Sequence, residues 1–543
     1  MVYLFKKIKN GKICWYLGES KRENGKVRRT WQKYLGTAEN VGEALKHGIF
    51  PKETDVLEFG LCAALLKIDN EIQFKDTVDK IFKKREQGLS YGEHLLLTII
   101  NRIDNPTSKN KFSSWFDSTF LKRIFPVKKE YLSSQDFWNH WNHISEEDIN
   151  KIQEALLKKI IPLVKIDNLV YDPTNFTNYI EEHGNQKIMQ FGHSKDGRKL
   201  RQVNLALLVT KEEGMPLWHH TYNGNVNDVT EFKEFIKILT SRITLFARKC
   251  KKIIIIFDKG NNSKNNIKKV DKKLSFFVVG SLKPSEHTEL FDINLEEFKE
   301  KYLTVEEKEV LCTSKIIDIY EGKKKVVVTY SKELAYKNKI RVEKALGKAL
   351  NQLKNIQARL KNSNLTRDEL LIKVSKIADK QWIKGLIDYQ VKEEKGDLSF
   401  SFEENNKAYE KISKSFGKNI LFTDDLSLKV TEIINLYSDK YIVEEQIKNL
   451  KDRHVISFTP AWCWTDKMIR VHAFTCVMAL LFLRFLCKIA GKKYSQDTIV
   501  EQLKRIKLTL IKMPKSNEIK PQISRLNDIQ RELVNKLGLR EYS

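Results

Sequence analysis

The chain has 543 residues, which is too long for one hydrophobic core and suggests three or four domains. Lys and Arg outnumber Asp and Glu by 97 to 70, and the net charge of +27 favours a polyanionic partner, either nucleic acid or an anionic membrane. A Lys-rich composition inherited from an AT-rich genome accounts for part of that excess. The seven cysteines include no CxxC pair, which argues against a zinc site or a disulfide framework and fits a reducing cytoplasm.

The first two segments differ in pattern. Residues 1–50 are predicted to form a small β-rich unit, because "VYLFKKI", "KICWYLGES" and "KVRRTWQKYLG" are short, aromatic-rich runs separated by Asn-Gly pairs. Residues 51–165 carry apolar residues at helical spacing and are predicted to be helical. Basic and aromatic residues mix in "TSKNKFSSWF", so this helical region is a candidate DNA-binding region, although an ordinary solvated face explains such a patch equally well.

Residues 166–282 show the pattern of a sheet. The run "KKIIIIFDKG" is continuously β-branched, which is typical of a strand covered on both faces. The alternation of strands and helices predicts a mixed α/β fold in which helices pack against the sheet. The expected elements are strands at 169–171, 203–210 and 215–222, a helix at 228–243, and strands at 251–260 and 274–281.

The remaining chain is predicted to hold three segments. Residues 283–415 are highly charged and join a strand to a long basic helix, so we expect an insertion that lies outside the sheet. Residues 416–490 resume with a strand and a helix over 428–452, followed by the most apolar window of the chain. Arg484 interrupts that window, which favours a buried core helix over a membrane span. Residues 491–543 are expected to form a C-terminal helical tail.

Two apolar strands are each followed by a carboxylate, Asp172 after "NLVY" and Asp258 after "IIIIF". Active sites of α/β sheets lie at such carboxyl ends of strands, and Glu444 could approach from the later helix. Three carboxylates suit hard divalent ions such as Mg²⁺, which prefer oxygen ligands. The alternative is turn chemistry, because Asp before Pro or Lys-Gly commonly ends a strand.

Several motifs together resemble those of DDE transposases of bacterial insertion sequences. The stretch "YSDKYIVEEQIKNLK" resembles the Tyr-x2-Arg-x3-Glu-x6-Lys signature of that family, and its spacings put the four signature residues on one helix face. "YDPTNF" and "FDKGNNS" resemble the first and second aspartate motifs, and the likeness extends over residues 165–490. Lys440 stands where the family usually has Arg, which keeps the charge but loses the bidentate fork.

The resemblance implies a ribonuclease H-like catalytic core, divided by the insertion at 283–415. It implies three acidic residues that are both catalytic and metal ligands: Asp172, Asp258 and Glu444. It implies three residues that contact DNA near the cleaved end: Tyr437, Lys440 and Lys451. The cofactor would be two Mg²⁺ ions per site, for which Mn²⁺ can substitute.

The same resemblance implies cut-and-paste DNA transposition as the function. The partners would be double-stranded DNA, namely the inverted-repeat ends of the element and the target, and a second copy of the chain, with no membrane. The expected location is the bacterial cytoplasm, with the protein associated with the nucleoid when bound to DNA. Two other functions stay open: a catalytically inactive DNA-binding protein derived from a transposase, and a metal-dependent nuclease without strand transfer.

Some neighbouring residues have competing interpretations. Glu445 is the alternative to Glu444, and Asp424 with Asp425 is read as a turn or a helix cap. The histidines His193, His219 and His220 match no zinc spacing and are expected at the surface or partly buried. Two tryptophans of "PAWCWTDK" could stack on a splayed base, although core packing or a loop anchor is the preferred interpretation: Trp462 and Trp464.

Overall fold

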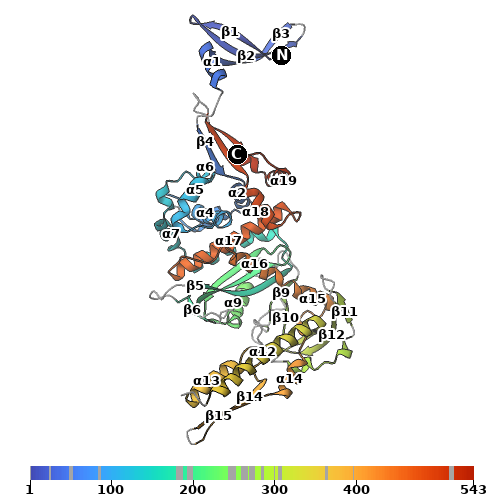
Figure 1. Cartoon of the computed structure of the whole chain (residues 1–543). Coiled ribbons are helices and arrows are strands. Elements are labelled where there is room, and N and C mark those ends of the chain that lie inside the picture. Colours follow the sequence, from blue (N-terminus) through green and yellow to red (C-terminus); the bar gives the residue numbers. More distant parts are fainter. Residues whose placement is uncertain are drawn as a thin grey trace.

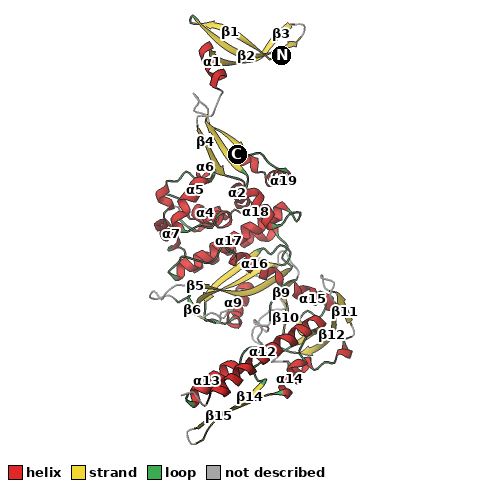
Figure 2. Ribbon diagram, viewed as in Figure 1, coloured by secondary structure: helices red, strands yellow, loops and turns green. Residues whose placement is uncertain are grey.

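The computed structural model describes most of the chain (Figures 1 and 2). The described residues are 2–23, 26–47, 53–83, 87–178, 187–192, 200–241, 252–258, 267, 276–282, 287–298, 300–303, 309–360, 365–394, 397–512 and 519–543.

The N-terminal unit is a three-stranded antiparallel sheet, as its pattern predicted. Its elements are β1 (Val2–Lys9), β2 (Lys12–Glu23), β3 (Lys26–Thr37) and α1 (Ala38–His47). Asn10 and Gly11 have φ values of 53° and 75°, so they form the tight turn that an Asn-Gly pair favours between β1 and β2. Figure 1 shows this unit at one end of the molecule, beyond the helical layer.

A helical layer follows, as expected from its apolar spacing. Its helices are α2 (Gly60–Ile72), α3 (Phe74–Ile81), α4 (Tyr91–Asp104), α5 (Phe112–Ser118), α6 (Leu121–Ile124), α7 (Ser134–Trp141) and α8 (Glu146–Ile160). Capping boxes at Ser90 and Ser145 begin α4 and α8.

The C-terminal segment returns to this layer and is only partly helical, so the expected helical tail is wrong. It contains α18 (Gln496–Lys504), β17 (Lys507–Lys512), β18 (Ile519–Ile523) and α19 (Asp528–Leu537). The two strands form a small sheet with β4 (Glu53–Glu58), in the order β18-β17-β4. The run "KLTLIK" alternates polar and apolar residues, which is the strand period, but its partner β4 lies some 450 residues earlier in the chain.

The centre of the molecule is a ten-stranded mixed sheet. Its first strands are β5 (Asn168–Asn178), β6 (Gln190–Phe191), β7 (Arg201–Thr210), β8 (Pro216–Asn223), β9 (Ile253–Ile256) and β10 (Phe276–Ser281). β7 pairs antiparallel with both β8 and β5, whereas β5, β9 and β10 run parallel to one another. The resulting order β8-β7-β5-β9-β10, with α9 (Asp228–Ser241) before β9, is the arrangement of a ribonuclease H-like core and confirms the predicted mixed α/β class.

The charged segment from residue 283 does not lie outside this sheet, contrary to expectation. Its strands β11 (Glu300–Leu303), β12 (Glu309–Asp318) and β13 (Lys323–Tyr330) extend the sheet, because β13 pairs with β16 (Lys418–Thr423), and β16 pairs with β10. The run "KKKVVVTY" groups its lysines and valines in two blocks, so it lacks the alternation that marks a strand with one buried face. Only the return of β16 some 90 residues later provides the partner strand.

The rest of that segment has a hydrophobic core of its own. It comprises α12 (Lys332–Arg359), α13 (Arg367–Ala378), β14 (Ile387–Glu394), β15 (Asp397–Glu404) and α14 (Asn406–Ser413). Leu353, Leu370 and Val374 are fully buried there, in a cluster separate from the main core. Of the segment 283–415 that the sequence predicted as an insertion, this part, from α12 to α14, is the portion that lies outside the sheet. Figure 1 shows it extending away from the sheet.

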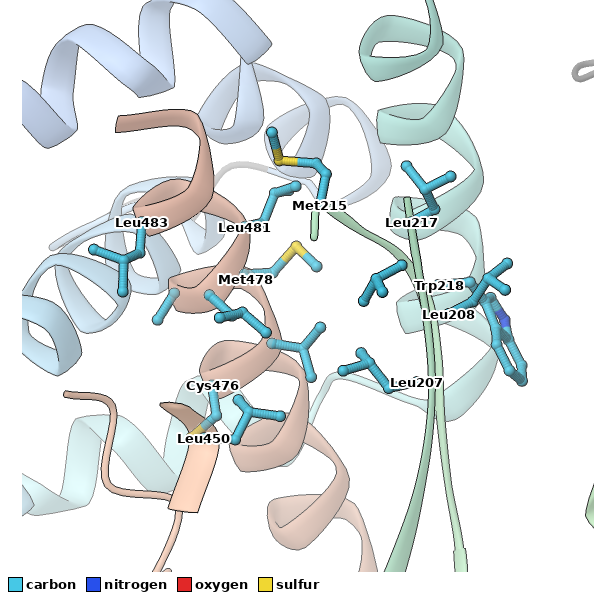
Figure 3. Packing of buried hydrophobic residues seen from close by; sticks show 14 of the residues in the cluster. Leu207, Leu208, Met215, Leu217, Trp218, Leu450, Cys476, Met478, Leu481 and Leu483 are labelled. Carbon is cyan, nitrogen blue, oxygen red and sulfur yellow. The ribbon is translucent and has the colours of Figure 1, made fainter. Parts of the chain in front are cut away.

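Helices from the end of the chain cover one face of the central sheet. They are α15 (Val430–Ser438), α16 (Tyr441–Lys451) and α17 (Asp466–Ala490). Figure 1 shows α16 and α17 between the sheet and the helical layer, with α9 on the opposite face. Figure 3 shows Leu207 of β7 pointing toward Met478 of α17, whereas Trp218 of β8 lies on the other side of the strands.

The helix α17 is long and apolar enough to cross a membrane by length and composition alone. However, 78% of its most apolar window is buried inside the protein, between the sheet and the helical layer. The expectation of a buried core helix is therefore confirmed.

Candidate active site

The register of β5 and β9 brings the two aspartates together. These parallel strands pair Val170 with Ile256, and Asp172 and Asp258 each lie two residues further along. Neighbouring strands are about 4.8 Å apart, so the register places the two Cα positions at the same level on adjacent strands. A period of two also places both side chains on one face of the sheet.

The opposite face is filled by α9, which decides where the carboxylates point. Tyr171 stacks on Phe235 of α9 with ring centroids 4.3 Å apart, and Phe257 packs against Phe232 at 4.8 Å. Each aspartate follows one of these buried aromatic residues. Asp172 and Asp258 therefore face the side that α15 and α16 cover.

Asp172 does not end its strand, contrary to the sequence-based interpretation. β5 continues to Asn178, and Asp172 and Pro173 pair with Leu207 and Ala206 of β7. The pairing of β5 with β9 does end at Val170. Pro173 has no N–H to donate, but no hydrogen bond to β9 is needed at its position. The aspartate lies at the end of the parallel pairing but in the middle of the antiparallel pairing.

The glutamate helix is also broken where one helix over 428–452 was expected. α15 ends at Ser438 and α16 begins at Tyr441, so the signature residues are divided between two helices, although Asp439 and Lys440 between them keep right-handed helical backbone angles. The Lys440 N–H donates a hydrogen bond to the Tyr437 carbonyl three residues earlier, which forms a tight turn between the two helices. Lys211, directly after β7, binds the Asp439 carboxylate at 2.8 Å and holds the break against the sheet.

Two signature residues contact Asp258 after this break, and one of them links Asp258 to a third signature residue. The Tyr437 hydroxyl donates to Asp258 Oδ1 at 2.9 Å. The Lys440 Nζ lies 3.3 Å from Asp258 Oδ2 and 3.3 Å from Glu444 Oε1. Two acidic positions thus share one ammonium group, although one stands on a strand and the other on a helix.

The electrostatics of this group reflect both burial and charge. Burial, followed by the Asp258 carboxylate, raises the pKa of Tyr437, so its hydroxyl stays protonated and donates. Burial alone would lower the pKa of Lys440, but its interactions with Tyr437 and with the carboxylates of Asp258 and Glu444 outweigh burial and raise that pKa. Lys440 therefore stays a cation between the two carboxylates.

Glu445, the alternative ligand, faces another part of the molecule. Its charge contributes, after burial and Asp497, to the raised pKa of Cys487 on α17. Glu444 instead shares Lys440 with Asp258. The geometry favours Glu444 over Glu445 as the acidic residue that approaches the two aspartates.

Ser281 belongs to the same row, and the sequence analysis missed it. β10 pairs Val279 with Ile256, so Ser281 lies level with Asp258 on the next strand. The Ser281 side chain hydrogen-bonds Tyr437, which lowers the pKa of that tyrosine against the larger effect of burial. The available signal was a small polar residue that ends "FFVVGS", the third parallel strand in the row.

A divalent cation fits the donor chemistry of this row. Asp172, Asp258 and Glu444 offer only carboxylate oxygens, which Mg²⁺ prefers, and Lys440 already places a positive charge between two of them. Among the residues that the structure describes, no three acidic, histidine or cysteine side chains are close enough to share an ion. Glu444 and Asp258 are each engaged by Lys440, so the ligand set would form when a metal ion displaces that ammonium group.

The structure also places three other candidate residues, namely Asp424, Asp425 and Lys451. Asp424 accepts the Val278 N–H at 2.8 Å, and Asp425 accepts from Ser427 and pairs with Lys252, which confirms a turn at this site. Lys451 is exposed, with its Nζ 5.5 Å from the Phe176 ring, so its DNA contact stays a prediction.

The exposed tryptophans and the buried His219 differ from part of what the sequence predicted. Trp462 and Trp464 are 60% and 45% exposed, so they do not pack in the core, and their role as loop anchors stays a prediction. His219 is only 3% exposed, because it packs against Phe474 of α17, and burial lowers its pKa to about 3. His220 is partly buried, as expected. His193 lies outside the described residues.

Comparison with known families shows the protein family to which this site belongs. Residues 167–459 match the profile of the transposase DDE domain, which is more than half of the chain. The chain belongs to the transposase DDE domain family. The matched segment of this DDE transposase domain includes Asp172, Asp258, Tyr437, Glu444 and Lys451, and the family generally uses divalent metal ions.

The other comparisons add little. No curated protein matches the chain. The solved structure of a piggyBac transposase synaptic complex with hairpin DNA, determined by cryo-electron microscopy, aligns with 83% of this chain and 82% of its own at 11% identity and a TM-score of 0.39. Since that likeness is weak, the fold assignment of this DDE transposase domain rests on the strand order described above.

Proposed function

We propose that the protein is a transposase that cleaves DNA at the ends of its own insertion sequence and joins those ends to target DNA. The observation that carries this proposal is the row of Asp172 and Asp258 on adjacent parallel strands, with Glu444 linked to it through Lys440. Cut-and-paste transposition by a bacterial element is the form that the sequence signature favours.

In this proposal each residue has a separate task. Asp172, Asp258 and Glu444 are the catalytic carboxylates and would hold two Mg²⁺ ions, or Mn²⁺ in their place. When bound, such ions stabilise the charge on the entering and leaving oxygens of a phosphodiester displacement. Tyr437 orients the Asp258 carboxylate through its 2.9 Å hydrogen bond, and Lys440 neutralises it.

DNA recognition would use the basic surface around the row. Lys451 is exposed near Phe176 of β5, on the same face as the carboxylates. Tyr437 and Lys440 contact Asp258 rather than solvent, so their contact with DNA requires them to exchange this partner. Two element ends must be held together, which supports a homodimer on DNA.

The test uses the purified chain, a supercoiled plasmid that carries the inverted-repeat ends of the element, and Mg²⁺ or Mn²⁺. We expect end cleavage followed by joining. Asp172→Ala, Asp258→Ala and Glu444→Ala should each lower cleavage at least a thousandfold and leave DNA binding unchanged, because each removes a metal ligand. Glu445→Ala is the matched control and should keep full activity.

The outcomes separate the alternatives. Cleavage without joining would support a metal-dependent nuclease, and tight binding without cleavage would support an inactive DNA-binding protein. If one of the three alanine variants keeps its activity, that residue is not part of the site.

A further inference from the structure

The N-terminal sheet has two faces of different chemistry. On one face, which we call the aromatic–basic face, lie alternate residues of β1 and β2 together with part of β3: Tyr3, Phe5, Lys7, Lys9, Lys12, Cys14, Tyr16, Ser20, Arg22, Arg29, Gln32 and Tyr34. The registers Phe5↔Tyr16 and Tyr16↔Tyr34 align a row of rings across all three strands. Among the side chains that the structure describes, this face carries five cations and no carboxylate, because Glu19 alternates to the other face.

Two of these cations are fixed in position by the rings beneath them. The Arg29 guanidinium lies 3.8 Å from the Phe5 ring centroid and donates to the Tyr3 hydroxyl at 3.0 Å. The Lys7 Nζ lies 5.2 Å from the Tyr16 ring centroid. Both cations donate to the same neutral atom, Gln32 Oε1, at 3.1 Å and 3.0 Å. Two positive groups thus converge with no negative partner between them.

The whole sheet shares this lack of neutralising partners. Residues 2–23 and 26–37 contain ten Lys and Arg but two Glu, and among the side chains described in residues 2–22 and 27–37 no basic group forms a salt bridge. The registers even place like charges directly opposite, Lys9 against Lys12 and Lys21 against Arg28. Such pairs destabilise an isolated sheet, and a bound polyanion would offset that cost.

The length of the sheet favours an extended ligand over a small anion. Lys12 and Arg22 are ten residues apart on β2, which is about 33 Å at about 3.3 Å per residue. One turn of duplex DNA is about 34 Å long, and antiparallel β-sheets and ribbons are known to dock in its grooves. The cations along this face could therefore follow the phosphates of one turn.

We propose that the aromatic–basic face is a duplex DNA-binding surface, with Lys7 and Arg29 as its central phosphate contacts. This inference rests on the proposed function and assigns DNA binding to a segment outside the matched catalytic domain. Direct phosphate contact by fixed cations adds affinity without sequence preference.

The test compares two double variants of the full chain that remove the same charge from opposite faces. Lys7→Gln with Arg29→Gln alters the aromatic–basic face, and Lys6→Gln with Lys33→Gln alters the other face as a control. Binding to a duplex containing an element end is measured by fluorescence anisotropy over a range of salt concentrations. We expect the first variant to bind about tenfold more weakly and to lose about two units of the salt-dependence slope, since each phosphate contact contributes about 0.9.

The control variant should bind within about twofold of the unaltered chain, with its slope nearly unchanged, because its charges lie on the face that does not meet DNA. Equal effects of the two variants, or no effect of the first, would overturn the proposal. So would a loss confined to RNA or to anionic vesicles. Lys9→Gln with Lys12→Gln, next to the turn, is a second variant on the same face that leaves the ring contacts intact.

Asp258→Ala separates this inference from the proposed function. Lost cleavage in that variant, with unchanged binding by the Lys7 and Arg29 variant, would refute only the DNA-binding face. A chain that binds DNA through this face but never cleaves it would refute only the proposed function.

Discussion

At the scale of single residues, the acidic row is organised by Lys440. An ammonium group is a compact point charge with three donors, so it can lie between two carboxylates that stand on different elements. Lys440 is 22% exposed, and it joins Asp258 of the sheet to Glu444 of α16. Lys440 therefore places one positive charge between the two acidic residues that the proposed function assigns to metal binding.

Lys440→Gln tests this role without any measurement of activity. Loss of the ammonium leaves Asp258 and Glu444 to repel each other, and we expect the free energy of unfolding in EDTA to fall by about 1 kcal/mol, since both carboxylates are partly exposed. Added Mg²⁺ should stabilise the variant more than the unaltered chain, because it no longer competes with a side chain. Thermal unfolding with and without Mg²⁺ measures both effects. Lys448→Gln on the same helix is the control, and an equal response of all three proteins to Mg²⁺ would contradict the metal site.

At the scale of elements, His220 of the edge strand β8 joins three helices. Its Nδ1 lies 2.6 Å from Glu231 of α9 and its Nε2 lies 3.0 Å from Glu146 of α8, while Arg470 of α17 binds the same Glu146 at 2.9 Å. Burial alone would lower the pKa of His220, but the two carboxylates raise it to about 9 from 6.5. The folded protein therefore holds His220 as a cation that ties the helical layer to the sheet.

This network makes stability depend on pH in a defined direction. Because the folded pKa lies above the unfolded one, the contribution is fully present below pH 6.5 and is lost as the pH rises through about 9. A difference of about 2.5 units corresponds to about 3 kcal/mol at most, since each unit is about 1.4 kcal/mol. We expect His220→Gln to lower the free energy of unfolding by up to this amount below pH 6.5 and by much less above pH 9. Urea unfolding at both pH values measures it, and a difference that does not change with pH would refute the network.

At the scale of the whole molecule, the residues that the structure describes form two separate hydrophobic cores. The main core includes α17, the central sheet and the helical layer, whereas α12, α13, β14 and β15 enclose the second. The surface ion pair of Lys414 with Asp292, at 3.0 Å, is one polar contact that links the parts. A few polar contacts couple two cores weakly, so each can unfold as its own unit.

Matched cavity variants test this division. Leu353→Ala in the second core and Leu480→Ala in the main core each remove a fully buried side chain, and each should cost about 2–5 kcal/mol. We expect calorimetry to show two transitions, of which Leu353→Ala lowers one and Leu480→Ala lowers the other. A single transition that both variants lower together would show that the cores unfold as one.

The sequence by itself determined the local features of this protein. The Asn-Gly turn at Asn10, the capping boxes at Ser90 and Ser145, the strands at 203–210 and 215–222, and the apolar core helix all follow from short-range pattern. The signature spacing also identified the family. These features depend on residues within about a dozen positions of one another, which periodicity and propensity can report.

Only the tertiary structure decided which distant segments meet. The alignment of Asp172, Asp258 and Ser281 depends on the register of three parallel strands, which no single strand encodes. The break at Asp439 depends on Lys211, which follows β7, and the extension of the sheet by β13 depends on β16. In each case the partner lies tens to hundreds of residues away, and the free energy of pairing is set by packing against the whole sheet rather than by local preference.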